Sequence, residues 1–189
     1  MVHGTNYYLR QAWKKPSLEM LRERMIAWRE SNAIVKVERP LRIDRARALG
    51  YKAKRGIIIL RVRVKRGGRK RERKHVKGRK SRKQTNRKTL KMNYRWVAEI
   101  RAARRYPTLE VLNSYNIGQD GKNYFFEIIM IDPTKPEIQN DRTLKWIIDN
   151  RKRAERGLTS AAKKSRGLRS KSPKMKVRPS LRAWNRQGK

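Results

Sequence analysis

Apolar and polar residues alternate most regularly in residues 57–65, IIILRVRVK, so neighbouring side chains differ in polarity over the second half of the segment. This period of two predicts a strand whose aliphatic side chains meet a core. The other face presents three cations, Arg61, Arg63 and Lys65, at intervals of ~7 Å, which is twice the rise of a strand residue. Such a row suits successive phosphates of a nucleic acid better than a small substrate.

Three further segments favour strands. Residues 34–38 alternate and are β-branched, whereas residues 109–117 and 124–131 are rich in large apolar side chains. The turn between the last two contains Asp120 and Gly121, the strongest short-range signal of a β-hairpin. We therefore predict four strands in one mostly antiparallel sheet.

Apolar residues recur with a helical period in residues 18–31, 42–49 and 94–104, which predicts three helices packed on the sheet. In the third helix the pattern places Trp96 on the buried face and Glu99 on the exposed face. The predicted fold class is thus α+β: a small, mostly antiparallel four-stranded sheet with packed helices, plus a long basic internal loop and a basic C-terminal extension.

The charge of the chain indicates what kind of partner it binds. The net charge is +39 and the pI about 11.6, and such values indicate a polyanionic partner but give no information about the fold. Residues 65–91 hold fifteen Lys or Arg against one acid, and residues 151–189 hold the same numbers, whereas residues 92–150 are neutral with eight of each. The basic segments have few aliphatic side chains, so we expect them to order only on a phosphate backbone.

The charge pattern predicts a division of the chain into three parts. Residues 1–66 and 92–150 form a globular α+β domain, residues 67–91 a basic RNA-binding loop, and residues 151–189 a basic C-terminal extension. A loop this long inside a domain is uncommon unless it is functional or disordered.

The candidate RNA contacts are basic residues of the loop, the extension, the cationic strand face and the segment before that strand. Arg forks onto phosphate and stacks on bases, whereas Lys acts as a point charge, so the strongest candidates are five loop arginines: Arg69, Arg71, Arg73, Arg79 and Arg82. The full set is Arg42, Arg45, Arg47, Lys52, Lys54, Arg55, Arg61, Arg63, Lys65, Arg66, Arg69, Lys70, Arg71, Arg73, Lys74, Lys77, Arg79, Lys80, Arg82, Lys83, Arg87, Lys88, Lys163, Lys164, Arg166, Arg169, Arg178 and Arg182.

No combination of residues indicates catalysis or a cofactor. The chain has no Cys, and His3 and His75 cannot make a zinc site by themselves. Asp120, Glu127 and Asp132 are the carboxylates that a two-metal nuclease would need, but Asp120 belongs to the turn and Asp132 to a strand end. We therefore expect no enzyme, no metal, no cofactor and no small-molecule substrate.

Targeting signals are missing as well. No apolar run reaches the ~18 residues of a membrane span, and the first residues lack the apolar core of a signal peptide. We expect no membrane partner and a cytoplasmic location.

Two other classes of function stay open beside RNA binding. A chromatin-like nucleic-acid compacting protein would also be basic and free of Cys, although typically richer in Lys and without a hairpin. A nuclease or RNA-modifying enzyme is the other class. Preference for duplex DNA would favour the first, and metal-dependent cleavage the second.

The chain resembles the archaeal and eukaryotic large-subunit ribosomal protein family numbered fifteen in the "e" series. The resemblance rests on three long runs, residues 38–71, 109–147 and 156–168, together with YLRQAW (8–13) and RPSLR (178–182), and is of the archaeal type. It implies a structural constituent of the large subunit, bound to the largest rRNA and to neighbouring ribosomal proteins. It also implies an α+β domain at the outside of the particle, extensions threaded inward, and no catalytic residue.

Overall fold

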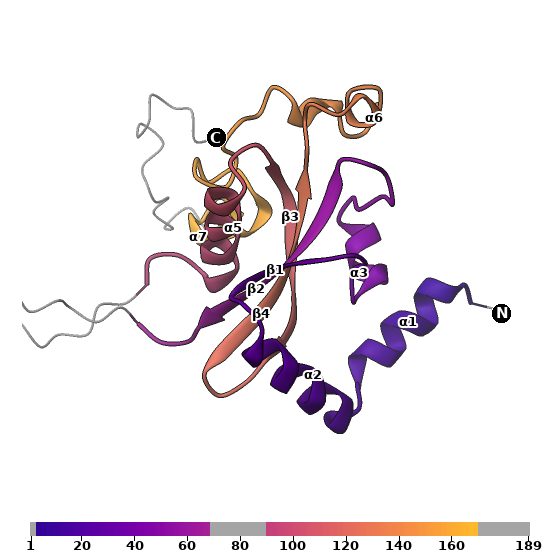
Figure 1. The fold of residues 1–189 in the computed structure, drawn as a ribbon, viewed down its shortest axis with the longest axis vertical. Helices are drawn as coiled ribbons and strands as arrows, with labels where there is room; N and C mark the ends of the chain where they lie inside the picture. The colour runs from indigo at the N-terminus through magenta and orange to yellow at the C-terminus, as the bar shows by residue number, and fades with distance from the viewer. Residues whose placement is uncertain (1–2, 69–89, 170–189) are drawn as a thin grey trace, which may run out of the picture.

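The computed structural model describes residues 3–68 and 90–169, and at its centre is one antiparallel sheet of four strands (Figure 1). The strand order is β1-β2-β4-β3, and every neighbouring pair is antiparallel. The strand bounds are β1 Ile34–Val37, β2 Ile57–Lys65, β3 Glu110–Gln119 and β4 Asn123–Ile131. The predicted α+β class and the four-stranded antiparallel sheet are confirmed.

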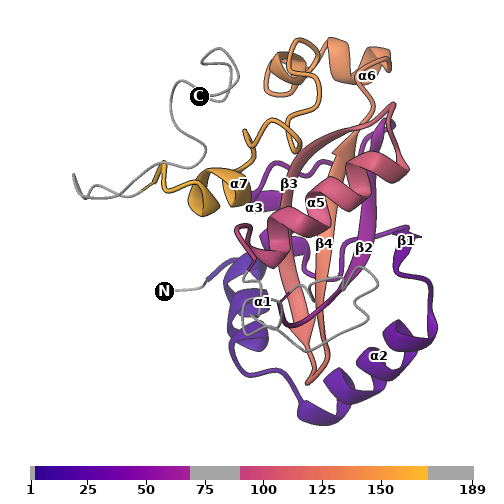
Figure 2. The same ribbon diagram turned by 90° about the vertical axis from the view of Figure 1, so that its left-hand side faces the viewer.

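Helices cover both faces of this sheet. α5 lies across one face with α7 beside it, and α3 lies on the other face (Figures 1 and 2). The helices are α1 Thr5–Lys14, α2 Leu18–Glu30, α3 Ile43–Ala48, α5 Tyr94–Arg105, α6 Pro136–Gln139 and α7 Ser160–Ser165, with a 3-10 turn, η1, at Lys145–Ile147. The three predicted helices correspond to α2, α3 and α5.

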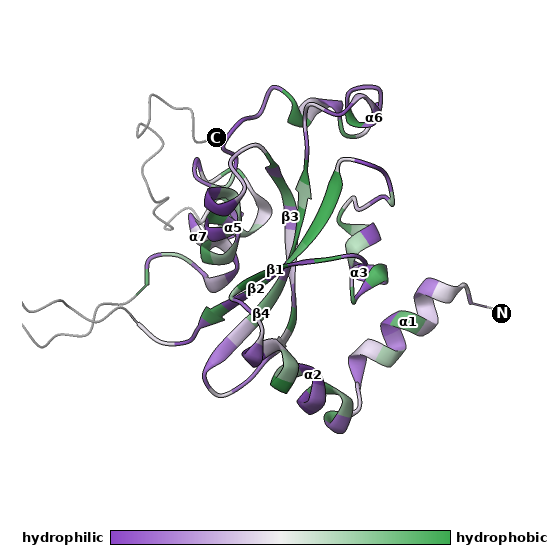
Figure 3. Cartoon of the chain, viewed as in Figure 1, coloured by the Kyte–Doolittle hydropathy of each residue, from purple (hydrophilic) through white to green (hydrophobic). Residues whose placement is uncertain are grey.

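The core is divided by the sheet into two layers, because successive side chains of a strand point to opposite faces. On β4, Phe125 and Ile129 join the layer that contains Trp28 of α2, while Phe126 and Ile128 join the layer that contains Ala98 of α5. Figure 3 shows the apolar residues concentrated in the central strands, with polar residues around them. A strand buried on both faces reads as a continuous apolar run, which explains the sequence of β4.

The β3–β4 hairpin closes at the predicted turn. The Asp120 carboxylate accepts a hydrogen bond of 2.7 Å from the backbone N–H of Lys122 and a second from that of Asn123. β3 carries two irregularities, between Val111 and Asn113 and between Asn116 and Gly118. Such bulges bend a strand and re-aim its side chains.

Glu99 is a correction to the sequence prediction. Its side chain is fully buried, not exposed, because α5 packs with this face between β3 and the segment that leads into α7. The carboxylate accepts hydrogen bonds from the hydroxyls of Ser114 and Thr159. These bonds satisfy a buried acid, which the helical pattern alone does not reveal.

Residues 151–169, which the charge pattern places in the basic extension, pack against the globular domain. The division into domains stays a prediction, but this part of residues 151–189 packs against the domain and does not leave it at residue 151. Ala154 and Ala162 are buried, and the indole N–H of Trp96 donates a hydrogen bond of 2.7 Å to the Ala154 carbonyl. Small side chains allow this close packing, and they carry little apolar signal in a sequence pattern. The rest of the segment, residues 170–189, lies outside the described residues.

The burial of Glu99 predicts a pH dependence of stability. Burial raises the pKa of the Glu99 carboxyl, and the hydrogen bonds from Ser114 and Thr159 oppose this effect. Between its unfolded and native pKa values the native state then binds more protons, so this residue makes stability fall as pH rises. We expect Glu99→Gln to remove this contribution, so that wild type loses stability relative to the variant as pH rises above ~4.5.

Urea unfolding of both proteins at fixed salt, from about pH 4 to about pH 8, measures this difference. Other titrating groups are common to the two proteins and cancel. Stability curves that run parallel over this range would show that the pKa of Glu99 is the same in the native and unfolded states.

Candidate nucleic-acid interface

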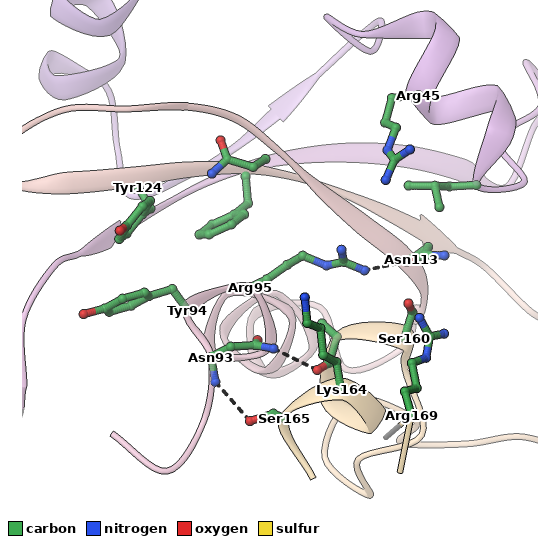
Figure 4. A pocket seen from close by; sticks show the side chains of 14 residues that line it. Arg45, Asn93, Tyr94, Arg95, Asn113, Tyr124, Ser160, Lys164, Ser165 and Arg169 are labelled. Atoms are coloured by element: carbon green, nitrogen blue, oxygen red, sulfur yellow. Dashed lines mark hydrogen bonds between the residues drawn. The ribbon is translucent and has the colours of Figure 1, made fainter. Parts of the chain in front are cut away.

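Basic, amide and aromatic side chains surround a cleft of about 890 Å³, here called the α5–α7 cleft (Figure 4). Four cations from distant parts of the chain line it: Arg45 of α3, Arg95 of α5, Lys164 of α7, and Arg169 after α7. They share the cleft with amide and aromatic side chains of α5, β3 and β4. Among the described residues that line this cleft there is no carboxylate.

Arg95 is the fixed cation of the α5–α7 cleft. Its Nε donates a hydrogen bond of 3.0 Å to Ser114 Oγ, and its Nη2 donates one of 3.2 Å to Asn113 Oδ1. Burial lowers the pKa of Arg95, nearby Glu99 opposes this, and the charges of Arg45 and Arg169 lower it further. The guanidinium is therefore oriented by the fold, and it stands close to like charges.

The wall formed by α7 is attached to the start of α5. Asn93 Nδ2 donates a hydrogen bond of 2.9 Å to the Ala161 carbonyl, and the Asn93 N–H donates one of 3.2 Å to Ser165 Oγ. Thr159 caps α7 by accepting a hydrogen bond from the N–H of Ala162 while it donates to Glu99. The cleft therefore keeps its shape only while α7 stays docked on α5.

A second, smaller cleft of about 570 Å³ lies at the tip of the hairpin and is here called the hairpin-tip cleft. Its five basic residues are Arg29, Arg63, Lys65, Arg66 and Lys122. None of the described residues that line it is acidic, although Arg29 lies 3.9 Å from the carboxylate of Asp120. The two clefts together expose nine cations to whatever occupies them.

The two ends of the predicted basic loop meet at the side chain of Tyr94. The Gly67 N–H donates a hydrogen bond of 2.9 Å to the Tyr94 hydroxyl, which in turn donates one of 3.2 Å to the Gly67 carbonyl. Arg66 donates a hydrogen bond of 2.8 Å to the Asp120 carbonyl and lies 5.0 Å from the centre of the Tyr124 ring. The loop therefore leaves the domain between the hairpin-tip cleft and the α5–α7 cleft.

The predicted row of cations on β2 is only partly on the surface, because α2 packs over that face of the strand. Arg61 is half-buried, lies 5.5 Å from the centre of the Trp28 ring and donates to Ser31 Oγ. Arg63 is half-buried as well and donates to the carbonyl of Arg29. Lys65 is exposed, so only the third cation of the predicted row has its side chain fully on the surface.

Two further candidates of the sequence analysis are joined to an acid. Lys52 and Lys54 contact Asp141 at 2.7 and 2.9 Å, and Lys52 also donates to the Thr143 hydroxyl. These hydrogen bonds hold the pKa of the Asp141 carboxyl well below its usual range. Both lysines therefore help to attach the segment after α6 to the domain.

The remaining candidates are spread over the molecule. Arg42 is 5.0 Å from the centre of the Trp13 ring and 3.8 Å from Asp44. Arg166 is buried and donates a hydrogen bond of 3.0 Å to the Gly157 carbonyl. Arg47 and Arg55 are exposed, and Lys163 is half-buried on α7. The following candidates lie outside the described residues: Arg69, Lys70, Arg71, Arg73, Lys74, Lys77, Arg79, Lys80, Arg82, Lys83, Arg87, Lys88, Arg178 and Arg182.

Several residues of the two clefts are absent from the candidates that the sequence indicates. Among them are Arg95, Arg29 and Lys122. Asn113 and Asn116 cannot be recognised as cleft residues from the sequence, because a single amide side chain does not alter the apolar–polar pattern of a strand. Arg29 and Lys122 come from the end of a helix and from a turn, so only the fold brings them together.

The carboxylates considered for metal binding are separated. Asp120 lies at one end of β4, Asp132 follows the other end, and Glu127 is buried between them, where it accepts hydrogen bonds of 3.0 and 3.2 Å from the Leu41 N–H. The described residues contain no group of three His, Cys, Asp or Glu that could hold a metal ion. Nor do they contain a helix that is long and apolar enough to span a membrane.

Fold and clefts define the class as a small α+β protein whose surface hollows are lined by cations and amides. The chain belongs to the ribosomal protein family whose model is described as "Ribosomal L15", which matches residues 4–184. This family is a ribosomal one and is not a class of enzymes. The resemblance inferred from the sequence is confirmed.

Relatives from archaea cover the chain from end to end. A protein of Methanospirillum hungatei named "Large ribosomal subunit protein eL15" is 52% identical, with 97% of each chain covered. Proteins with the same name from Methanocella arvoryzae and Methanocorpusculum labreanum are 49% and 48% identical, with 100% and 96% of each chain covered.

The attachment of α7 can be tested at Trp96. In Trp96→Phe the ring is kept in part, but the buried Ala154 carbonyl keeps only the hydrogen bond of 3.2 Å from the Gly157 N–H and no longer accepts the shorter one from the indole. A hydrogen bond of this kind contributes about 0.5–1.5 kcal/mol, so we expect faster amide exchange in α7 and lower overall stability.

Trp146→Phe is the matched control for this change. Trp146 is exposed and donates a hydrogen bond of 2.9 Å to the Thr143 carbonyl, which water can reach. We expect amide exchange in α7 to stay as in wild type. Equal exchange in the two variants would contradict the role given to Trp96.

Proposed function

We propose that this protein is a structural, non-catalytic constituent of the large ribosomal subunit, which binds and stabilises large-subunit rRNA. Family membership over residues 4–184 supports the ribosomal part of this function. The observation that carries rRNA binding is the lining of the two clefts, which contains nine cations and, among the described residues, no carboxylate. Two of the nine, Arg95 and Arg29, lie 4.0 and 3.9 Å from carboxylates outside the lining, those of Glu99 and Asp120. Neighbouring ribosomal proteins are the other expected partners.

The electrostatics of the clefts support a polyanion as the partner. Cations held near one another repel, and a phosphate backbone relieves this repulsion and releases its own counterions. The predicted basic loop begins and ends beside both clefts, so one strand of RNA can contact the loop and the domain together. A chromatin-like role has less support, since the matched family is ribosomal.

Removal of cleft charges should weaken rRNA binding and flatten its salt dependence. The test variant changes three residues of the α5–α7 cleft: Arg45→Gln, Lys164→Gln and Arg169→Gln. We expect a lower affinity for a transcribed large-subunit rRNA, with a slope against log salt that is smaller by about 0.7–0.9 for each phosphate that is no longer neutralised. Filter binding over a salt series measures both quantities.

A control variant with the same change in charge separates site from total charge. It changes three exposed cations near α6 and η1, which line neither cleft: Lys135→Gln, Arg142→Gln and Lys145→Gln. We expect its slope to stay close to that of wild type. Equal reductions of affinity and slope in both variants would mean that binding depends on net charge alone.

The loop arginines, which lie outside the described residues, are tested by a change that keeps their charge. Arg69, Arg71, Arg73, Arg79 and Arg82 are all replaced by Lys, which removes the fork that binds phosphate with two hydrogen bonds. Removing five forks at about 0.5–1 kcal/mol each should weaken rRNA binding by roughly two orders of magnitude. Unchanged affinity would show that the loop acts only through its charge.

A further inference from the structure

The α5–α7 cleft differs from an ordinary basic surface in one respect: its central cation is fixed and stands among amides. Arg95 uses Nε and Nη2 to bind Ser114 and Asn113, and the described residues offer no hydrogen bond to its Nη1. In Figure 4 the Arg95 side chain extends into the hollow between α5 and β3. A guanidinium held in this way loses little freedom when it binds a phosphate through its remaining N–H groups.

The charges around Arg95 point to an anion inside the cleft and not merely near it. Arg45 and Arg169 lie close enough to disfavour the charged form of Arg95, and Lys164 lines the same hollow. The nearest acid, Glu99, lies 4.0 Å from Arg95 Nε, but it is fully buried and its carboxylate oxygens already accept hydrogen bonds from two hydroxyls. A single phosphate within reach of these cations would relieve their mutual repulsion.

The other half of the cleft offers groups that recognise a base. Asn116 is exposed on β3, and within the described residues no hydrogen bond involves its side chain or the Nδ2 of Asn113. A free amide can donate to and accept from the polar edge of a base. Tyr94 and Tyr124 stand beside these amides as half-buried aromatic rings, with centroids 4.8 Å apart.

The shape of the α5–α7 cleft fits an unpaired nucleotide better than an RNA duplex. A volume of about 890 Å³ is that of a pocket for a small ligand, whereas the phosphates of a duplex lie on a convex surface with the base edges turned inward. Proteins that read RNA by its bases use nucleotides turned out of the stack. We propose that the α5–α7 cleft holds one unpaired nucleotide of the rRNA, with its phosphate on Arg95 and its base against Asn113 and Asn116.

This inference rests on the proposed rRNA binding, and its test uses a change that leaves the charge alone. Asn116→Ala removes an exposed amide that holds no other part of the described fold. We expect about fivefold weaker binding to transcribed large-subunit rRNA, the effect of one hydrogen bond, with the salt slope unchanged. Arg95→Gln should lower both the affinity and the slope, the latter by about 0.7–0.9.

Asn140→Ala is the matched control, because Asn140 is an exposed amide at the end of α6 and lines neither cleft. We expect it to bind as wild type does. Ultraviolet crosslinking of the full chain to the same rRNA, followed by mass spectrometry, should place a nucleotide on a peptide containing Tyr94 or Asn116. The crosslinked nucleotide should be unpaired in the rRNA.

The outcomes separate this inference from the proposed function. Wild type that fails to bind rRNA would overturn both. Salt-dependent rRNA binding with Asn116→Ala equal to Asn140→Ala, or cleft crosslinks only to paired nucleotides, would overturn the nucleotide site and leave rRNA binding in place. If polyglutamate, but not rRNA, slows amide exchange of the residues that line the cleft, the cleft binds an acidic protein partner. This result also overturns the inference.

Discussion

The buried carboxylate of Glu99 is the contact on which the rest of the cleft depends. It joins three parts of the chain: its own helix α5, the Ser114 hydroxyl on β3, and the Thr159 hydroxyl that caps α7. Leaving a buried acid without partners costs more free energy than a single hydrogen bond supplies. The two hydroxyls therefore fix the distance between the sheet and α7, and the space that remains beside them is the α5–α7 cleft.

The same contact orients the cation at the centre of the cleft. Ser114 Oγ donates to Glu99 and accepts from Arg95, so a single hydroxyl links the buried acid with the guanidinium. Burial raises the pKa of the Glu99 carboxyl, which lies 4.0 Å from Arg95 Nε. The packing of the core, together with the high net charge, therefore sets the electrostatic surroundings of Arg95.

Two arginines elsewhere in the domain are held by carbonyl groups and aromatic rings in place of acids. Arg66 binds the Asp120 carbonyl and lies over Tyr124, and Arg153 binds the carbonyls of β3 and lies 4.5 Å from the centre of the Trp146 ring. Carbonyl groups and rings orient an arginine without removing its charge. A chain with a net charge of +39 can thus fold as a compact domain and still present positive potential to a polyanion.

The sequence by itself determined the sheet, the three main helices, the hairpin at Asp120 and the ribosomal family, because these depend on local periodicity, turn chemistry and long runs of residues. It did not reveal Glu99 or the position of residues 151–169, since both depend on small or polar side chains that bury only through contacts with distant segments. The residues of the α5–α7 cleft could be assigned to one site only from the structure, for the same reason. Arg45 and Arg169 were recognised as basic, but Arg95, Asn113 and Asn116 acquired a role only when the fold placed α3, α5, β3 and α7 around one hollow, because hydrogen bonds between distant residues leave no periodic pattern.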